Sequence, residues 1–134
     1  MSSEANLVKE PGLKAGADLS ADANQFKAVK LDAAGDIVLC SVAGELVFGV
    51  LYNKPKSGEA AEVVVGGSPK VQADAAINEM DLLATSADGQ FAVSTPAVGN
   101  TDHIFAIAKD AAAAAGEIIS AMIARGSTAN TAVS

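Results

Sequence analysis

The sequence predicts a mainly β fold: a compact β-barrel or sandwich built from two related strand–loop–strand units. Short runs of β-branched and apolar residues recur along the chain. Turn signals separate these runs about every eight to twelve residues, the spacing typical of a sandwich or barrel. Residues 45–65 and 103–123 also repeat one order of features, an apolar run, a turn-like middle, a Gly-Glu pair and a second apolar run.

Residues 1–20 are expected to form an extended N-terminal arm. Pro11, Gly12 and Gly16 interrupt this segment, and its one short apolar pair is Leu7-Val8. A β-domain follows at residues 21–126, and a polar C-terminal tail at 127–134. The expected strands of the domain lie at residues 26–31, 36–42, 45–52, 61–67, 68–73, 81–85, 90–94, 103–108 and 117–124.

Turns between these strands are marked by glycine. Asp88-Gly89 predicts a hairpin because glycine tolerates a positive φ. The repeat extends to residues 32–66 and 86–124, in which Gly35 corresponds to Gly89 and Phe48 to Phe105. Neither unit could bury its apolar face alone, so the two are expected to pack on each other.

The segment at residues 109–125 also has a helical interpretation. Five consecutive alanines favour a helix, and Asp110 could cap it. The matching segment of the first copy contains Pro55, which discourages a long helix. We therefore expect a short helical turn or loop near residues 111–115 and a strand at residues 117–124.

Composition limits the classes of function. The chain has 134 residues, enough for one domain. Half of them are hydrophobic but only 4% are aromatic, so small aliphatic side chains must fill the core. The formal net charge is −7 at pH 7, and no basic patch with interleaved aromatics is present. These features disfavour binding to nucleic acid.

Sequence motifs for catalysis or metal binding are missing. His103 is the only histidine and Cys40 the only cysteine, and no Gly-x-Ser-x-Gly motif accompanies them. We expect no enzymatic activity, no cofactor and no metal site. The N-terminus lacks a signal-peptide pattern, and the apolar stretch at residues 37–52 is shorter than the ~20 residues of a membrane helix. The protein is therefore expected to be made in a cytoplasm and to stay away from membranes.

One ordered series of motifs resembles a known family. Its motifs are Gly49-Val50-Leu51, Asn53-Lys54-Pro55, Gly58-Glu59, Val63-Val64-Val65 and Lys70-Val71. The Ala-rich segment, Gly-Glu pair and last apolar run of the second copy continue the series. The chain resembles the small head decoration, or capsid cement, proteins of tailed bacteriophages over about residues 12–126. The stretch at 77–81 departs from the pattern, which has a glycine before the Asp.

This resemblance implies a structural virion protein without enzymatic activity. Such a protein binds the outer surface of the assembled head and bridges major capsid subunits against the pressure of the packaged DNA. The implied partners are the major capsid protein and further copies of the chain, as a homotrimer or a dimer. The implied location is the outer capsid surface, after synthesis in the cytoplasm of the host bacterium.

Two groups of residues are candidates for contact with the capsid. In the arm, Leu7 and Val8 are expected to be apolar anchors, and Lys9 and Lys14 to meet acidic capsid surface. Lys54, Pro55 and Lys56, at the tip of a loop, form the second group.

Two other functions stay open from the sequence. The chain could be a small β-barrel module that binds a ligand or peptide, which requires a concave apolar pocket with a few convergent polar groups. It could also be an enzyme that uses His103. Replacing His103 with Ala would abolish activity if the protein were such an enzyme, and would have almost no effect under the other two hypotheses.

Overall fold

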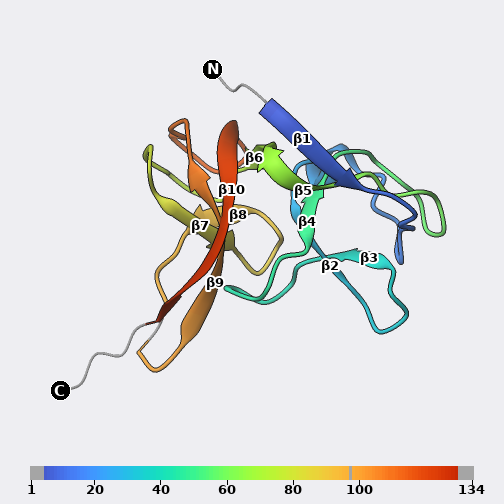
Figure 1. Ribbon diagram of the computed structural model, residues 1–134, viewed down its shortest axis with the longest axis horizontal. Helices are drawn as coiled ribbons and strands as arrows, with labels where there is room; N and C mark the ends of the chain where they lie inside the picture. The colour runs from blue at the N-terminus through green and yellow to red at the C-terminus, as the bar shows by residue number, and fades with distance from the viewer. Residues whose placement is uncertain (1–4, 97, 130–134) are drawn as a thin grey trace.

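The structure is a computed structural model that describes residues 5–96 and 98–129. It is mainly β, as predicted, and consists of two five-stranded antiparallel sheets side by side (Figure 1). The one helical segment in the described ranges is a 3₁₀ turn, η1 (Asp22–Asn24). The expected strands within residues 26–124 are all present, and an additional strand precedes them.

The first sheet has the strand order β1-β5-β4-β2-β3, and the second has the order β6-β10-β9-β7-β8. The strands of the first sheet are β1 (Ala5–Glu10), β2 (Ala28–Leu31), β3 (Ile37–Leu39), β4 (Gly49–Leu51) and β5 (Val63–Ser68). Those of the second are β6 (Lys70–Gln72), β7 (Leu82–Thr85), β8 (Phe91–Val93), β9 (Thr101–Ala108) and β10 (Ile118–Ala129).

The two orders are identical when β1–β5 are matched with β6–β10. The repeat therefore takes in both whole sheets and is wider than residues 32–66 and 86–124. We call residues 5–68 the first unit and residues 70–129 the second unit. Pro69 alone separates β5 from β6; it is buried, and its carbonyl accepts a hydrogen bond from the Ala121 amide at 3.0 Å.

Matching turns support this correspondence. The Asp32 amide donates to the Asp36 carbonyl at 2.8 Å, and the Ser86 amide donates to the Gln90 carbonyl at 2.7 Å. The glycines of these two turns, Gly35 and Gly89, have φ angles of 83° and 85°. Since glycine adopts a positive φ without steric cost, the two Gly positions fix the two hairpins in the same way.

The predicted N-terminal arm is part of the first sheet. Residues 5–10 are extended, but they form β1 and pair antiparallel with β5. Ala15 then makes a parallel bridge to Ile37, just as Ala73 of the second unit bridges to Phe91. Ala15 and Leu19 are buried. The segment that was expected to project therefore completes the first unit, because its backbone is hydrogen-bonded and its apolar side chains reach the core.

Of the two forms expected near residues 111–115, a short helical turn or a loop, the structure has the irregular loop. Ala112 exchanges two backbone hydrogen bonds of 2.9 Å with Ile77, and these occupy the amide and carbonyl that a helix would need. Gly116 then turns the chain with a φ of 88°. At the C-terminus, β10 continues to residue 129, so residues 127–129 of the expected tail lie in a strand, and residues 130–134 lie outside the described ranges.

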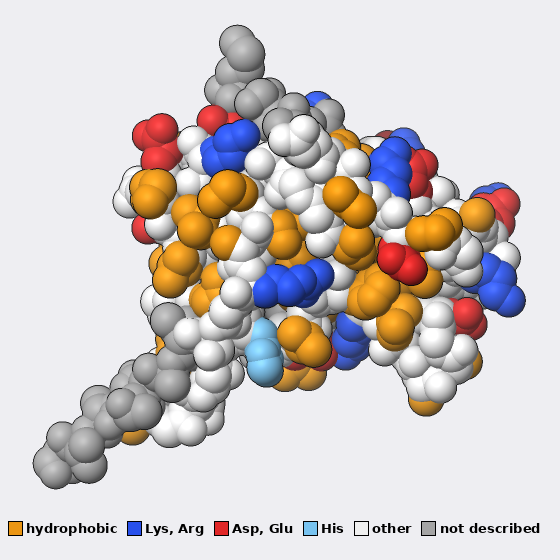
Figure 2. Space-filling model, in the orientation of Figure 1, with side chains coloured by type: hydrophobic (Ala, Val, Ile, Leu, Met, Phe, Trp, Pro, Cys, Tyr) orange, Lys and Arg blue, Asp and Glu red, His pale blue; other side chains and the backbone are white. Residues whose placement is uncertain are grey.

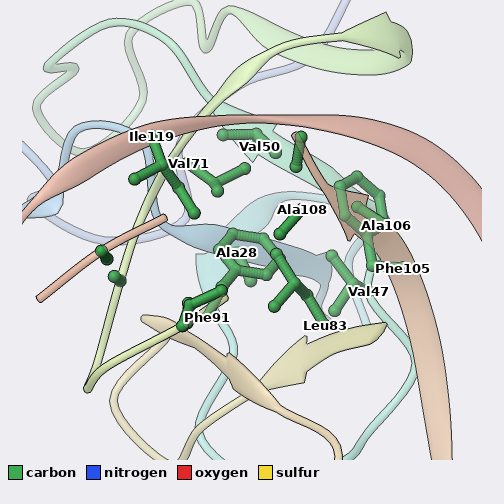
Figure 3. Packing of buried hydrophobic residues seen from close by; sticks show 14 of the residues in the cluster. Ala28, Val47, Val50, Val71, Leu83, Phe91, Phe105, Ala106, Ala108 and Ile119 are labelled. Carbon is green, nitrogen blue, oxygen red and sulfur yellow. The ribbon is translucent and has the colours of Figure 1, made fainter. Parts of the chain in front are cut away.

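The main hydrophobic cluster spans both units (Figure 3). Ala28, Val47 and Val50 of the first unit lie against Phe91 and Phe105 of the second. The two phenylalanine rings are 5.5 Å apart between centroids. A smaller cluster lies within the first unit, around Val29, Ile37, Leu51 and Val63. One face of the first sheet therefore covers its own core, and the other face covers the core of the second unit.

The repeat gives a matched pair for a stability test. Phe105 is 1% exposed in the main cluster, whereas the corresponding Phe48 is only half-buried beside the smaller cluster. We expect Phe105→Ala to lower the free energy of unfolding by about 3–5 kcal/mol, and Phe48→Ala to lower it by less. Urea denaturation of both variants measures the difference, and equal losses would contradict the asymmetry between the two cores.

Cys40 makes stability sensitive to alkaline pH. Burial, followed by the nearby charge of Glu45, raises the pKa of the Cys40 thiol from 9.0 to about 12. The unfolded chain loses this proton above pH 9.0 while the folded chain keeps it, so stability present below pH 9 is lost as the pH rises toward 12. We expect this thiol to contribute a decline of at most roughly 1.4 kcal/mol per pH unit.

Urea denaturation at several pH values between 8 and about 11 measures this decline. The control is Cys40→Ala, which lacks the thiol but keeps every other titrating group. Its unfolding free energy is expected to fall less steeply with pH than that of the wild type. If the unfolding free energies of the two proteins fell equally steeply with pH, the raised pKa of the Cys40 thiol would be contradicted.

Candidate functional site: three surfaces

The candidate residues of the N-terminal segment occupy β1 and the chain that follows it. Val8 is 56% exposed, and Leu7 is half-buried. Lys9 forms an ion pair with Glu62, the residue before β5. Lys14 is exposed, and its backbone makes an isolated antiparallel bridge to Ala60. The surface therefore presents Val8 and two lysines, on a backbone held by the sheet.

The candidate residues of the 53–60 loop differ in exposure. Lys54 and Lys56 are exposed, and Lys54 pairs with Asp22 at 2.9 Å. Pro55 is buried, and its carbonyl accepts a hydrogen bond of 2.8 Å from the Leu19 amide. The expectation that Pro55 forms part of a contact surface is therefore wrong, because the chain at residues 13–19 packs over this side of the loop.

The structure brings the two candidate groups together. The Ala15 amide donates to the Glu59 carbonyl, and the Ala61 amide donates to the Leu13 carbonyl, both at 2.9 Å. We call the combined region the N-terminal surface. It consists of Val8, Lys9, Lys14, Lys54 and Lys56. Its fixed backbone means that a partner would meet a preformed surface.

The second surface is an apolar groove of about 620 Å³ on the first unit. Its apolar lining includes Leu31, Leu46, Phe48 and Val65. Leu46 is 63% exposed, although it is a large hydrophobic residue. We call this hollow the first-unit groove. Charged side chains stand at its rim: Glu10, Lys30, Glu45 and Arg125.

Ion pairing organises one side of the rim. Lys30 Nζ lies 2.9 Å from a carboxylate oxygen of Glu45. Burial raises the pKa of Glu45, but hydrogen bonds from Lys30 and from the backbone amides of Ser41 and Val42 outweigh it and lower the pKa overall. Glu45 is thus held charged and tied to the residues 41–42 backbone, which fixes the loop that carries Leu46.

Arg125 joins the two units beside the groove. Its guanidinium donates to the Val47 carbonyl through Nη1 and to the Phe48 carbonyl through Nη2, the latter at 2.7 Å. It also lies over the Phe105 ring, 4.9 Å from the centroid. Burial lowers the pKa of this guanidinium. Figure 2 shows hydrophobic side chains distributed around basic ones on the face that β10 crosses.

The third surface is an apolar patch on the outer face of the second sheet. Met80 and Met122 are 76% and 46% exposed, Leu82 is also exposed, and Ile107 is half-buried. Met80, Ile107 and Met122 line a hollow of about 450 Å³ there. We call these four residues the second-unit patch. Glu79 and Lys109 lie at its edge.

His103, the one histidine of the sequence, lies outside any cluster of metal-ligating side chains within the described residues. His103 is exposed on β9, and its backbone amide donates to the Gly44 carbonyl at 2.9 Å. Within residues 5–96 and 98–129, no group of three or more His, Cys, Asp or Glu side chains is placed to hold a metal ion. Over the same residues, no helix has the length and apolar character to cross a membrane.

A scan against models of known protein families found no match, and a search of curated protein sequences found no significant relative.

Arg125 provides a test of the joint between the units. We expect Arg125→Ala to lower the free energy of unfolding by about 1–3 kcal/mol, because two carbonyls lose a charged donor and Phe105 loses the cation above it. Arg125→Lys is expected to recover little, since an ammonium cannot reproduce the planar fork. Urea denaturation measures both, with Lys109→Ala as the exposed control. A free energy of unfolding equal to that of the wild type in Arg125→Ala would contradict the stabilising role of Arg125 between the units.

Proposed function

We propose that the protein is a structural component of a bacteriophage virion. It binds the outer surface of the assembled head and bridges major capsid subunits, which stabilises the shell. The observation that carries this proposal is the ordered series of motifs between Gly49 and Val71, which resembles that of the head decoration proteins. The protein acts without catalysis, and its partners are the major capsid protein and further copies of itself.

The structural role of these motifs supports the proposal. Asn53 accepts a hydrogen bond from the Glu62 amide at 2.9 Å and donates to the Ala60 carbonyl at 3.0 Å, so it holds the loop between β4 and β5 closed. The Lys56 amide donates to the Glu59 side chain at 2.7 Å within that loop. The motif residues thus maintain a strand–loop–strand element, as expected of a family that shares a scaffold rather than an active site.

The N-terminal surface is the proposed capsid contact. It carries Lys9, Lys14, Lys54 and Lys56, although the chain as a whole has a net charge of −7. Lys9 and Lys54 are already paired with Glu62 and Asp22, so Lys14 and Lys56 are the lysines of this surface proposed to meet an acidic capsid surface. Val8 supplies an exposed apolar anchor among them. The capsid is reached in the cytoplasm of the host, where the protein is made.

A second candidate function rests on the first-unit groove. A hollow of about 620 Å³ lined by apolar residues and a few charged ones is the feature expected of a module that binds a ligand or peptide. Under this alternative, binding would depend on Leu46 and Phe48 and would be independent of the N-terminal surface.

The proposed function is tested by co-sedimentation with empty phage heads, expanded and unexpanded, from the source phage. We expect saturable binding to expanded heads only, at a stoichiometry near the number of threefold or twofold positions. The double variant Lys14→Ala/Lys56→Ala is expected to bind about tenfold more weakly, because it removes two charges from the contact.

Lys109→Ala removes an exposed lysine from the opposite unit and serves as the matched control, which should bind like the wild type. Equal weakening by both variants would refute the N-terminal surface as the contact. Absence of binding to either kind of head would refute the decoration function and favour the ligand-binding alternative.

A further inference from the structure

The first-unit groove and the second-unit patch are the two apolar surfaces left over by the internal repeat. Matching the units strand by strand relates each groove residue to a residue of the second unit. In the order Leu31, Leu46, Phe48 and Val65, the equivalents are Thr85, His103, Phe105 and Ile123. In the order Met80, Leu82, Ile107 and Met122, the patch residues correspond to Phe26, Ala28, Val50 and Val64.

Inside the chain, these equivalent surfaces are packed against each other. Ala28 and Val50 are fully buried in the cluster that contains Phe105, and Phe26 and Ile123 pack at its margin. Phe105 is therefore covered by the first-unit equivalents of the patch, Ala28 and Val50 (Figure 3). Thr85 is also buried and Ile123 is half-buried, whereas His103 stays exposed at the margin of this contact. This contact explains why Phe105 is 1% exposed while Phe48, at the same place in the first unit, is only half-buried.

Backbone hydrogen bonds reinforce the internal contact. Gly44 of the first unit inserts between β7 and β9 of the second: its amide donates to the Thr85 carbonyl, and its carbonyl accepts from the His103 amide, both at 2.9 Å. The corresponding residues at the groove are Leu31 and Leu46. The second unit carries a loop in the place of the Gly44 loop, and its Gly99 has a φ of 84°, close to the 77° of Gly44.

We infer that copies of this chain associate head to tail, with the second-unit patch of one copy seated in the first-unit groove of the next. The contact repeats the one that the first unit makes with the second inside each chain. Each chain uses one groove and one patch internally and keeps one of each for its neighbours. The occupant of the groove is therefore a second copy of the chain, entering with Met80, Leu82, Ile107 and Met122.

The arrangement is heterologous, because the two surfaces in contact are different. A heterologous contact produces a ring when its rotation closes and an open filament when it does not. The number of copies follows from that rotation. The inference rests on the repeat and on burial, and it does not require the proposed function to be correct.

Complementary knock-outs test this contact. Leu31→Glu places a charge in the groove, at the position whose second-unit equivalent Thr85 is buried, and leaves the patch intact. Met122→Glu places a charge in the patch and leaves the groove intact. Both residues are exposed in the isolated chain, so both variants are expected to fold. Sedimentation velocity should show wild-type particles at a multiple of 13.3 kDa and each variant alone as a monomer.

An equimolar mixture of the two variants gives the decisive result. One intact patch and one intact groove remain between them, so the mixture is expected to form a dimer that cannot grow further. A monomeric wild type at all protein concentrations would overturn the inference, as would variants that still associate alone. A mixture that stays monomeric would also overturn it, since a self-complementary interface would behave in that way.

Val8→Glu separates this inference from the proposed function. Val8 lies beside Gly66 in the register of β1 and β5, while the groove residue Val65 points to the opposite face of the sheet. We expect Val8→Glu to keep the wild-type mass and to bind expanded heads more weakly. Loss of assembly in Leu31→Glu with unaltered assembly in Val8→Glu identifies the groove, whatever the result with heads.

Discussion

The packing of the first sheet onto the core of the second unit is the contact on which the structure depends. Each unit builds its core from small aliphatic residues, because only 4% of the chain is aromatic. Two of the four phenylalanines, Phe91 and Phe105, meet in the second unit, where Val47 and Val50 of the first unit cover them. Arg125 of the second unit stabilises the same contact by donating hydrogen bonds to two carbonyls of the first unit. The first unit thus has a core of its own and also covers the core of the second unit.

This contact also decides where apolar surface remains. The face of the first sheet that carries Val50 is buried against the second unit. The matching face of the second sheet, with Met80 and Met122, is exposed to solvent. An exposed apolar patch and an apolar groove are the kinds of surface through which proteins bind partners. The head-decoration proposal and the head-to-tail contact are compatible on these grounds, since the N-terminal surface is made of other residues.

Local sequence signals predicted the strands well. The features that were not predicted depend on pairing between segments that are far apart in the sequence. Gly35 and Gly89 mark their turns directly in the sequence, because a positive φ is a property of one residue. The pairing of β1 with β5, and the burial of Pro55 under residues 13–19, depend on segments about 40 to 60 positions apart. The alanines at 111–115 favour a helix locally, but their pairing with Ile77 prevails. The groove was not predicted because Leu46 and Phe48 have the hydrophobic character of core residues. The sequence does not show that no other sheet covers them in the first unit.

The single buried proline between β5 and β6 has a mechanical consequence. Pro69 has a ring-locked φ, and its carbonyl is bonded to β10, so the junction contains no slack in which one unit could swivel against the other. The shared hydrophobic core and the hydrogen bonds of Arg125 act beside this short junction. Together they hold the two sheets in one relative orientation, so a partner bound to one unit meets the other at a fixed angle.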